Sequence, residues 1–527
     1  MAPTRLRRAL TPTAEKILFA VLVAAYVAPF WTFRYIPTED GPPHLANANI
    51  IRHYHDADAH RIREYYTVNV RVPTNVGYHY ALAALLYLLR PQLAQRVILS
   101  LIVIFFAVAF RRLIAAMTGR PEPAAALVLP FIVGQPFQMG FFGSTLSLAV
   151  AVAALAYYWP RRGDLRIRDV VVLNAAAALA FWTHLLGWAI LVGGLVFFAY
   201  VEALWVTASP GPRPARPWYA RRLALPALLG PALALGLGYY FSQPRLSAVT
   251  HQTPQWLWEK FSRCSVLISF NDFQRWAAFG TARLLGLAAL VVIVAKSWPW
   301  RRRPGVTPAW RLTDALWGGA AALAAAAYVL APESTPFQGS WINIRLLLVM
   351  YVAVAAFVAG ARVGWLRRVM YVVAPAVALV HLAGILAGYT DGSRRLREFM
   401  RAKMVIPAGA TILPLVNQTP PRGSRVNYMK HAAAYFTLGT NAVDLTNYEA
   451  RYVYFPVRWR AGHLPVNLIK IKRSTPIYDV LGKAPVVDYV LLSGIEKQLG
   501  PLSTFLTDYD LIYFHGETSV YRRRPPP

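Results

Sequence analysis

Two adjacent acids and a histidine, in the stretch TEDGPPH (residues 38–44), are the residues best suited to chemistry in this 527-residue chain. Acidic residues are scarce, with 24 Asp and Glu against 55 Lys and Arg, so the pair Glu39 and Asp40 is unusual. Such a carboxylate could act as a general base or bind a metal ion, with His44 one helical turn further on. The alternative is structural: Asp40, or the threonine before the acids, caps a helix that begins at the two prolines. A cap needs only one such residue, and the three together favour a chemical role.

A single arginine, Arg345, ends the stretch PESTPFQGSWINIR (residues 332–345) and is the second candidate. A guanidinium can bind phosphate through two parallel hydrogen bonds. Its polar and aromatic neighbours, Asn343 among them, suit a sugar or head-group pocket. The alternative is an interfacial arginine whose charge reaches the membrane surface. Three further candidate binding residues stand in other short polar stretches: Gln135, Gln138 and His184.

The sequence assigns no cofactor and no metal ligand. A divalent metal at Asp40 and His44 stays open. The stretch RHYHDADAH (residues 52–60) has the residue types of a zinc site without a recognised spacing. The single cysteine, Cys264, permits neither an internal disulfide nor a cysteine-based metal site. Nucleotide-binding and hydrolase motifs are absent, so the energy for any reaction has to arrive with the substrate.

The elements that must position these residues are membrane helices. Hydrophobic residues make up 56 % of the chain and charged residues 15 %, and the mean hydropathy is +0.37. Soluble domains carry about 45–50 % apolar and about 25 % charged residues. Apolar runs long enough to cross a bilayer recur, which predicts a polytopic α-helical membrane protein. Eleven spans are expected, near residues 17–33, 97–110, 123–138, 144–159, 169–183, 185–205, 223–241, 277–295, 312–331, 344–361 and 369–388.

The loops between these spans alternate in charge, which predicts their sides. The N-terminus and alternate loops contain clusters of Lys and Arg, whereas the short loops between them contain Arg345 as their only basic residue. By the positive-inside rule the basic side, with the N-terminus, is cytoplasmic. The net charge of +31 is therefore a topology signal, and we expect no nucleic-acid partner. The apolar run at residues 77–89 is short for a span, and counting it would invert later loops, so we expect it to lie at the outer interface.

This topology places residues 34–96 in a long outer loop that begins with the acidic pair. The candidate residues of the later outer loops then converge on the same face, which indicates a cavity there. After Gly388 the sequence turns mixed, with strand-like runs ATILPLV, RYVYFPV, VVDYVLL and YDLIYF. We expect two domains: a membrane domain, residues 1–389, and an extracytoplasmic α/β or α+β domain, residues 390–527.

The motif TEDGPPH at the head of a long outer loop resembles the GT-C superfamily of integral-membrane glycosyltransferases. This superfamily includes the lipid A aminoarabinose transferases and the protein O-mannosyltransferases. The resemblance covers residues 15–390 and is mostly architectural; GSWINIRLLL is similar to a stretch of uncharacterised members. It implies that Asp40, or Glu39 beside it, takes the proton from an acceptor hydroxyl. That oxygen would attack, with inversion, a sugar carried on polyprenyl phosphate, and Arg345 would bind the leaving phosphate.

The chain departs from the superfamily in one respect. Several members carry a second acidic motif in the next outer loop, often linked to metal binding, but residues 134–145 contain no carboxylate. This leaves a metal-free mechanism, or a site completed by the loop at residues 242–276.

The resemblance implies a lipid-linked sugar, an envelope glycan, lipid or protein acceptor, and the bilayer as partners. Two rival functions stay open: a transporter or flippase of lipid-linked or envelope substrates, and a non-catalytic envelope assembly protein. Alanine- and arginine-rich composition suggests a GC-rich bacterial genome and hence a bacterial plasma membrane.

Overall fold

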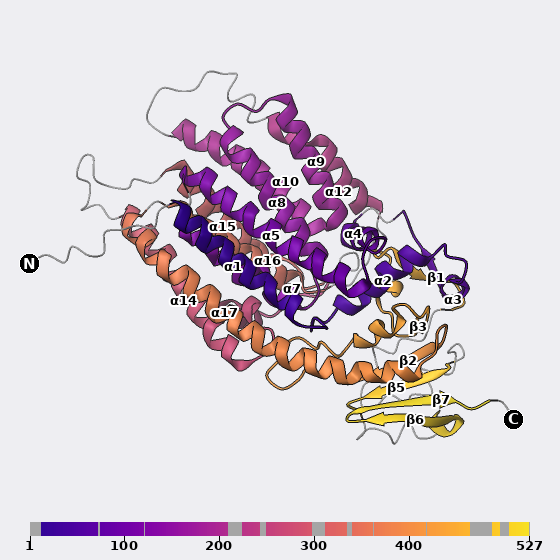
Figure 1. Cartoon of the computed structure of the whole chain (residues 1–527). Helices are drawn as coiled ribbons and strands as arrows, with labels where there is room; N and C mark the ends of the chain where they lie inside the picture. The colour runs from indigo at the N-terminus through magenta and orange to yellow at the C-terminus, as the bar shows by residue number, and fades with distance from the viewer. Residues whose placement is uncertain are drawn as a thin grey trace, which may run out of the picture.

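The computed structural model is a helical bundle joined at one end to a mixed β-sheet (Figure 1). It describes residues 12–71, 74–120, 122–208, 224–242, 249–297, 311–334, 340–361, 363–417, 419–463, 487–495 and 505–525. Within these residues, eight helices are long and apolar enough to cross a membrane. They are α1 (Pro12–Thr32), α5 (Pro91–Thr118), α8 (Phe142–Arg161), α10 (Leu185–Ala208), α14 (Asp272–Ser297), α15 (Leu312–Leu330), α16 (Ile342–Gly360) and α17 (Gly364–Phe399).

The other three predicted spans are helical too, but shorter or broken. Helix α9 (Ile167–Thr183) has 17 residues, and α12 (Gly230–Ser242) has 13. Residues 123–138 divide into η1 (Pro123–Leu127), α6 (Val128–Ile132) and α7 (Gln135–Gln138). Prolines 123, 130 and 136 punctuate this segment, and proline disfavours a continuous helix. Helix α4 (Gly77–Leu85) has nine residues, about 14 Å at 1.5 Å per residue, which is too short to cross a bilayer.

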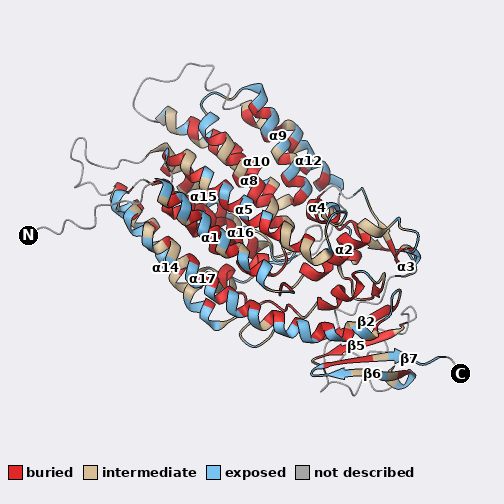
Figure 2. Cartoon of the chain, viewed as in Figure 1, coloured by how far each residue is buried: buried red, intermediate tan, exposed pale blue. Residues whose placement is uncertain are grey.

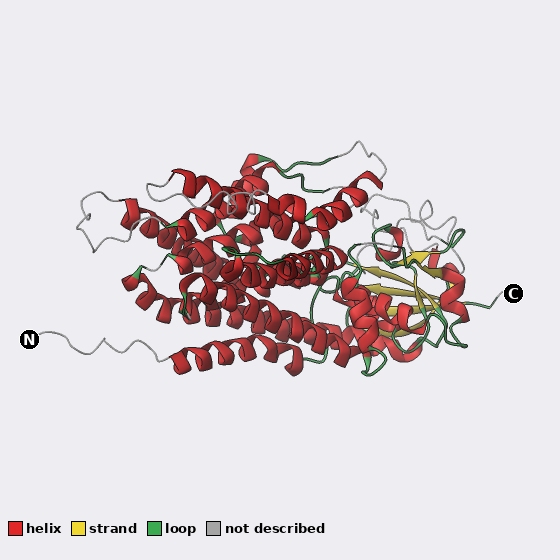
Figure 3. Cartoon of the chain, turned by 90° about the horizontal axis from the view of Figure 1, so that it is seen from above, coloured by secondary structure: helices red, strands yellow, loops and turns green. Residues whose placement is uncertain are grey.

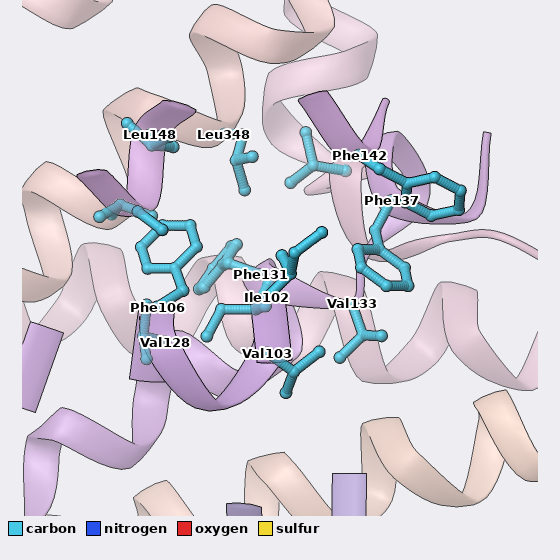
Figure 4. Packing of buried hydrophobic residues seen from close by; sticks show 14 of the residues in the cluster. Ile102, Val103, Phe106, Val128, Phe131, Val133, Phe137, Phe142, Leu148 and Leu348 are labelled. Carbon is cyan, nitrogen blue, oxygen red and sulfur yellow. The ribbon is translucent and has the colours of Figure 1, made fainter. Parts of the chain in front are cut away.

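Helix α16 lies at the centre of the bundle and α14 at its edge. In α16, 89 % of the most apolar 18-residue stretch is buried, whereas the corresponding share in α14 is 28 %. Around α16 the core is filled by side chains such as Phe106, Phe131 and Leu348 (Figure 4). The outer helices leave large apolar side chains such as Leu287 and Leu290 exposed, as a lipid-facing surface requires.

Ion pairs gather at the end of the bundle that lies away from the sheet. Four pairs connect helix ends there: Arg111 with Glu15, Arg367 with Glu122, Arg162 with Glu202, and Lys296 with Asp314. These residues stand beside the loops predicted to be basic. Each acid is almost completely buried and paired, which offsets its desolvation. The acids at this end therefore have a structural explanation, in contrast to those at the other end.

The C-terminal region forms a five-stranded mixed sheet in the order β3-β2-β5-β7-β6 (Figures 1 and 3). Parallel pairs join β2 to β3 and β5, and antiparallel pairs join β7 to β5 and β6. Three of the four predicted strand runs become strands here; RYVYFPV (residues 451–457) instead forms mostly turns between η6 (Glu449–Arg451) and β4 (Val457–Trp459), which begins at its last residue. The strands are β2 (Thr411–Val416), β3 (Val443–Asp444), β5 (Tyr489–Ser493), β6 (Tyr509–His515) and β7 (Thr518–Arg523).

The long loop after α1 is built into the C-terminal region. Its strand β1 (Tyr66–Val68) pairs antiparallel with β4 (Val457–Trp459), and Ile62 packs in one core with Leu413 and Val490. Helix α2 (Gly41–His53) therefore lies between the bundle and the sheet and is buried along most of its length (Figure 2), and α3 (His60–Tyr65) packs against β1 and β3. Helix α17 runs unbroken past residue 389, where we placed the domain boundary. The helical bundle and the C-terminal region are therefore packed together, and residues from both can position a site between them.

Candidate active site

A cavity of about 440 Å³ lies between the ends of the apolar helices and the C-terminal region. Three of its lining residues mark those ends: Phe141 is the N-cap of α8, His184 the C-cap of α9, and Trp341 the N-cap of α16. Lys430 and other residues up to Phe455 form the opposite wall. Of the predicted site residues, five line this cavity: Glu39, Asp40, His44, His184 and Arg345.

Asp40 stands at the N-cap of α2, but its side chain makes no capping hydrogen bond. Its backbone N–H donates to the Met139 carbonyl at 3.2 Å. Gly140 lies so close that a Cβ there would be 2.7 Å from the Asp40 Cβ, and its φ of +96° favours glycine. Burial, and then the charge of Glu39, raise the pKa of Asp40 to about 7, against the opposing effects of Lys430 and His44. The position of the carboxyl group is thus fixed, although it does not cap the helix.

Glu39, in contrast, has both carboxylate oxygens occupied. Oε1 accepts from the Lys430 ammonium at 2.8 Å, and Oε2 accepts from the backbone N–H of Asn427 at 3.0 Å. These contacts attach the loop before α2 to the C-terminal region. Of the two adjacent acids, Asp40 has the carboxylate available to a ligand, and Glu39 has a tethering role.

His431 is the ionisable side chain beside Asp40. Its Nε2 lies 3.6 Å from Asp40 Oδ1, and its ring packs at a tilt against the Tyr448 ring with centroids 4.5 Å apart. Burial, and then the charge of Lys430, hold the pKa of His431 well below its usual range. His431 is therefore a neutral neighbour that can exchange hydrogen bonds with the carboxylate or a ligand.

Arg345 brings a buried positive charge to the opposite side of the cavity. Its Nη1 lies 2.9 Å from His184 Nε2, its Nη2 donates to the Ser340 carbonyl at 2.5 Å, and its guanidinium stands 4.8 Å over the Phe141 ring. Among the described residues no carboxylate lies within 4.0 Å of it, although the residue is only 5 % exposed. Burial, and then this arginine, lower the pKa of His184 well below its usual range, so the imidazole is neutral. Glu333 acts on this buried cation electrostatically, yet the described residues form no salt bridge with it.

His44 belongs to a compact group with His79, from α4, and Glu449, from η6. His44 Nδ1 lies 2.6 Å from Glu449 Oε1 and 3.1 Å from His79 Nε2, which is 3.0 Å from Glu449 Oε2. Burial alone would raise the pKa of Glu449, but the charge of His44 and the hydrogen bonds with His44 and His79 together outweigh it and lower that pKa. Burial lowers the pKa of His79. From the sequence we considered a metal at Asp40 and His44; the structure instead groups His44 with these two residues.

Three predicted binding residues lie outside the cavity lining. Asn343 donates to the carbonyls of Tyr328 and Ala331, which joins α15 to α16. Gln138 accepts from the Tyr389 hydroxyl and donates to the Val133 carbonyl, and Gln135 is buried within α7. Asn343 and Gln138 thus connect parts of the bundle interior, whereas Gln135 Oε1 and Asn343 Oδ1 have no hydrogen-bond partner among the described residues.

Sequence reasoning missed the residues that the C-terminal region contributes. These are Lys430, His431, Tyr448 and Glu449, together with His79 from the outer loop. The four lie more than 380 positions from Asp40 in a segment without motif spacing, so no local signal marks them. The third acid of the site, Glu449, comes from the C-terminal region. From the sequence we had considered the loop at residues 242–276 as the segment that completes the site.

Comparison with known proteins finds similarity at the level of structure. No family model matches the chain, and no curated protein matches it. Among solved structures it is similar to the cryo-EM structure of the arabinofuranosyltransferase AftD from mycobacteria, with 14 % sequence identity and a TM-score of 0.49. The match covers 98 % of this chain and 40 % of the AftD chain, so this chain spans less than half of that protein.

Proposed function

We propose that this protein transfers a sugar from a polyprenyl-phosphate donor to a hydroxyl acceptor at the outer face of the plasma membrane. One observation carries the proposal: a buried arginine that makes no salt bridge with any described residue and a largely buried carboxylate that makes no helix-capping bond line the same cavity. Glycosyl transfer from a lipid phosphate needs both groups, one for the departing phosphate and one for the attacking hydroxyl.

Arg345 is suited to the phosphate. A buried charge is unfavourable unless it is paired, so a dianionic or monoanionic ligand would supply what the protein leaves out. Arg345 is fixed by the Ser340 carbonyl and by the ring of Phe141, so its guanidinium is preorganised before the ligand arrives. His184, neutral and 2.9 Å away, holds the guanidinium without cancelling its charge.

Asp40 is suited to the hydroxyl. Its carboxylate accepts the acceptor's proton as the acceptor oxygen forms a bond to the anomeric carbon. The bond from that carbon to the phosphate oxygen breaks on the opposite face, the phosphate leaves with both electrons, and the sugar is inverted. A base with a pKa of about 7 is balanced between holding and releasing a proton near neutral pH.

The position of the cavity suits an amphipathic donor. Its lining includes caps of three apolar helices, so the cavity lies where spans end and the polar region begins. A polyprenyl chain would stay among lipids beside apolar helix surfaces while its phosphosugar enters the cavity. Donor energy then comes from the sugar-phosphate bond, as the missing nucleotide motifs require.

The proposal is tested with the full chain in lipid nanodiscs. Radiolabelled polyprenyl-phosphate pentoses and hexoses are supplied with an envelope extract as the acceptor source, and label transfer is compared among wild type, Asp40→Asn and His53→Gln. His53 is a control because it pairs with Asp56 in a half-exposed turn away from the cavity. Transfer by wild type and His53→Gln, lost in Asp40→Asn, supports the proposal. The proposal is refuted if the wild type neither binds nor consumes any of the donors.

A further inference from the structure

Three side chains distant in the sequence bring ligand atoms to one point beside the cavity. His44 Nδ1, His79 Nε2 and Glu449 come from α2, α4 and η6, and their contacts measure 2.6, 3.0 and 3.1 Å. Ligands about 2.0–2.1 Å from a tetrahedral ion lie about 3.3 Å from one another. Two of the three separations, 3.0 and 3.1 Å, are close to that value, and the third is shorter.

The atoms are arranged around a common point and do not form a fully bonded network. Glu449 Oε1 is 2.6 Å from His44 Nδ1, yet within the described part of the chain it has no well-oriented hydrogen-bond partner. The two imidazole nitrogens face each other at 3.1 Å, so at most one can carry a proton between them. A cation at the shared point would use all these lone pairs at once.

Surrounding groups orient two of the three ligands as metal sites require. The Gly140 carbonyl can only accept, so His44 Nε2, 2.9 Å away, carries a proton; Nδ1 is then a lone-pair donor in the neutral ring, and in the charged ring it would release its proton when a cation binds. Asn47 donates to Glu449 Oε2 at 2.8 Å and accepts from Asn447 at 2.8 Å, which fixes the carboxylate. Second partners of this kind set both the tautomer and the direction of a ligand.

We propose that His44, His79 and Glu449 bind one divalent cation of the zinc type. Two imidazoles and one carboxylate form a ligand set that zinc accepts with three protein ligands, leaving a fourth position open. All three residues are buried, but both histidines also line the cavity, so the fourth position faces the substrate space. The site is independent of the identity of the sugar donor.

The proposed ion also has a structural consequence. Because Glu449 belongs to the C-terminal region and the histidines to the outer loop, the ion would join both regions directly behind Asp40. A metal-free alternative exists, in which the same three residues form only a hydrogen-bonded triad. That triad predicts no metal affinity, which separates the two cases.

The test uses the full chain, purified in detergent without a polyhistidine tag and stripped with a chelator. Co²⁺ is titrated at pH 7, followed by its visible absorption bands, and then displaced with Zn²⁺ under mass-spectrometric metal counting. We expect one Co²⁺ per chain in wild type and His53→Gln, and at least a tenfold loss of affinity in His79→Gln and Glu449→Gln.

Wild type alone can overturn the proposal, whatever the variants do to folding. Absence of stoichiometric Co²⁺ binding by folded wild type establishes the metal-free triad. Binding that persists unchanged in both His79→Gln and Glu449→Gln places the ion elsewhere. Zn²⁺ should also raise the melting temperature of stripped wild type, since an ion that binds only the folded state stabilises it.

Discussion

Replacing Asp40 by asparagine should abolish transfer while leaving the fold intact. The substitution keeps the shape and removes the basic oxygen. Loss of a positioned general base typically costs about 10²–10⁴ in rate, or about 3–5 kcal/mol at 1.36 kcal/mol for each tenfold change. An ordinary N-cap replacement would cost about 1 kcal/mol of stability, but Asp40 makes no side-chain cap bond. The melting temperature should therefore be maintained.

The matched control is the neighbouring acid. Glu39→Gln breaks the contact with Lys430, whose ammonium lies 2.8 Å from Oε1, but leaves the proposed base untouched. We expect lower thermal stability in this variant with far more residual transfer than in Asp40→Asn. The assay is initial-rate transfer of labelled sugar in nanodiscs, with melting followed in the same preparations. Asp40→Asn activity within threefold of wild type, or a lower melting temperature for Asp40→Asn than for Glu39→Gln, refutes the assigned roles.

Four further changes test other parts of the site and fold. Arg345→Ala should weaken donor binding by about 10–150-fold, since a hydrogen bond to a charged group contributes about 1.5–3 kcal/mol, and Arg345→Lys should restore only part of it; donor titration measures both. Gly140→Ala should reduce transfer because its Cβ would collide with Asp40 and its φ is positive, whereas Gly163→Ala, with open space around it, should transfer normally. Lys430→Met should lower the melting temperature because it leaves the partly buried Glu39 unpaired. Burial raises the pKa of Asp444 to about 6, so this group destabilises the fold increasingly as the pH rises from about 4 to 6. At pH 7.5 the free energy of unfolding of Asp444→Asn should therefore exceed that of wild type by at most about 3 kcal/mol, and its melting temperature should be higher. At pH 4 the two proteins should melt at the same temperature.

Much of the architecture could be predicted because its signals are local. Hydropathy alone located helices at all eleven predicted positions, and period-2 patterning located β2, β5 and β6. Continuity was less predictable: prolines divide residues 123–138, and hydropathy does not record such breaks. The pairing of β1 with β4 joins positions almost 400 residues apart, and three-residue strands carry too little pattern to be recognised.

The site was predictable only where a rare residue type stood out against its surroundings. Asp40 belongs to an adjacent pair of acids in an acid-poor chain, Arg345 is the only basic residue of its loop, and the alternation of basic loops put both on one face. His79 lay within an apolar run that we interpreted by its hydropathy, and nothing near Glu449 distinguishes it from other acids of a mixed domain. Residues such as His79 and Glu449, which form a site only when the folded chain brings them together, cannot be recognised from their local sequence.

The distribution of buried charge also bears on the choice between transfer and transport. At the far end of the bundle the buried acids are paired with basic residues, such as Glu122 with Arg367, and are fully explained as structure. Arg345, which forms no salt bridge with the described residues, and the carboxylate of Asp40, which does not cap its helix, occur instead at one cavity beside helix ends. A transporter requires its polar binding groups near the bilayer midplane, where discontinuous helices meet. Groups held at the end of the spans and walled on one side by a folded polar region serve better to carry out a reaction at the membrane surface than to pass a substrate across it.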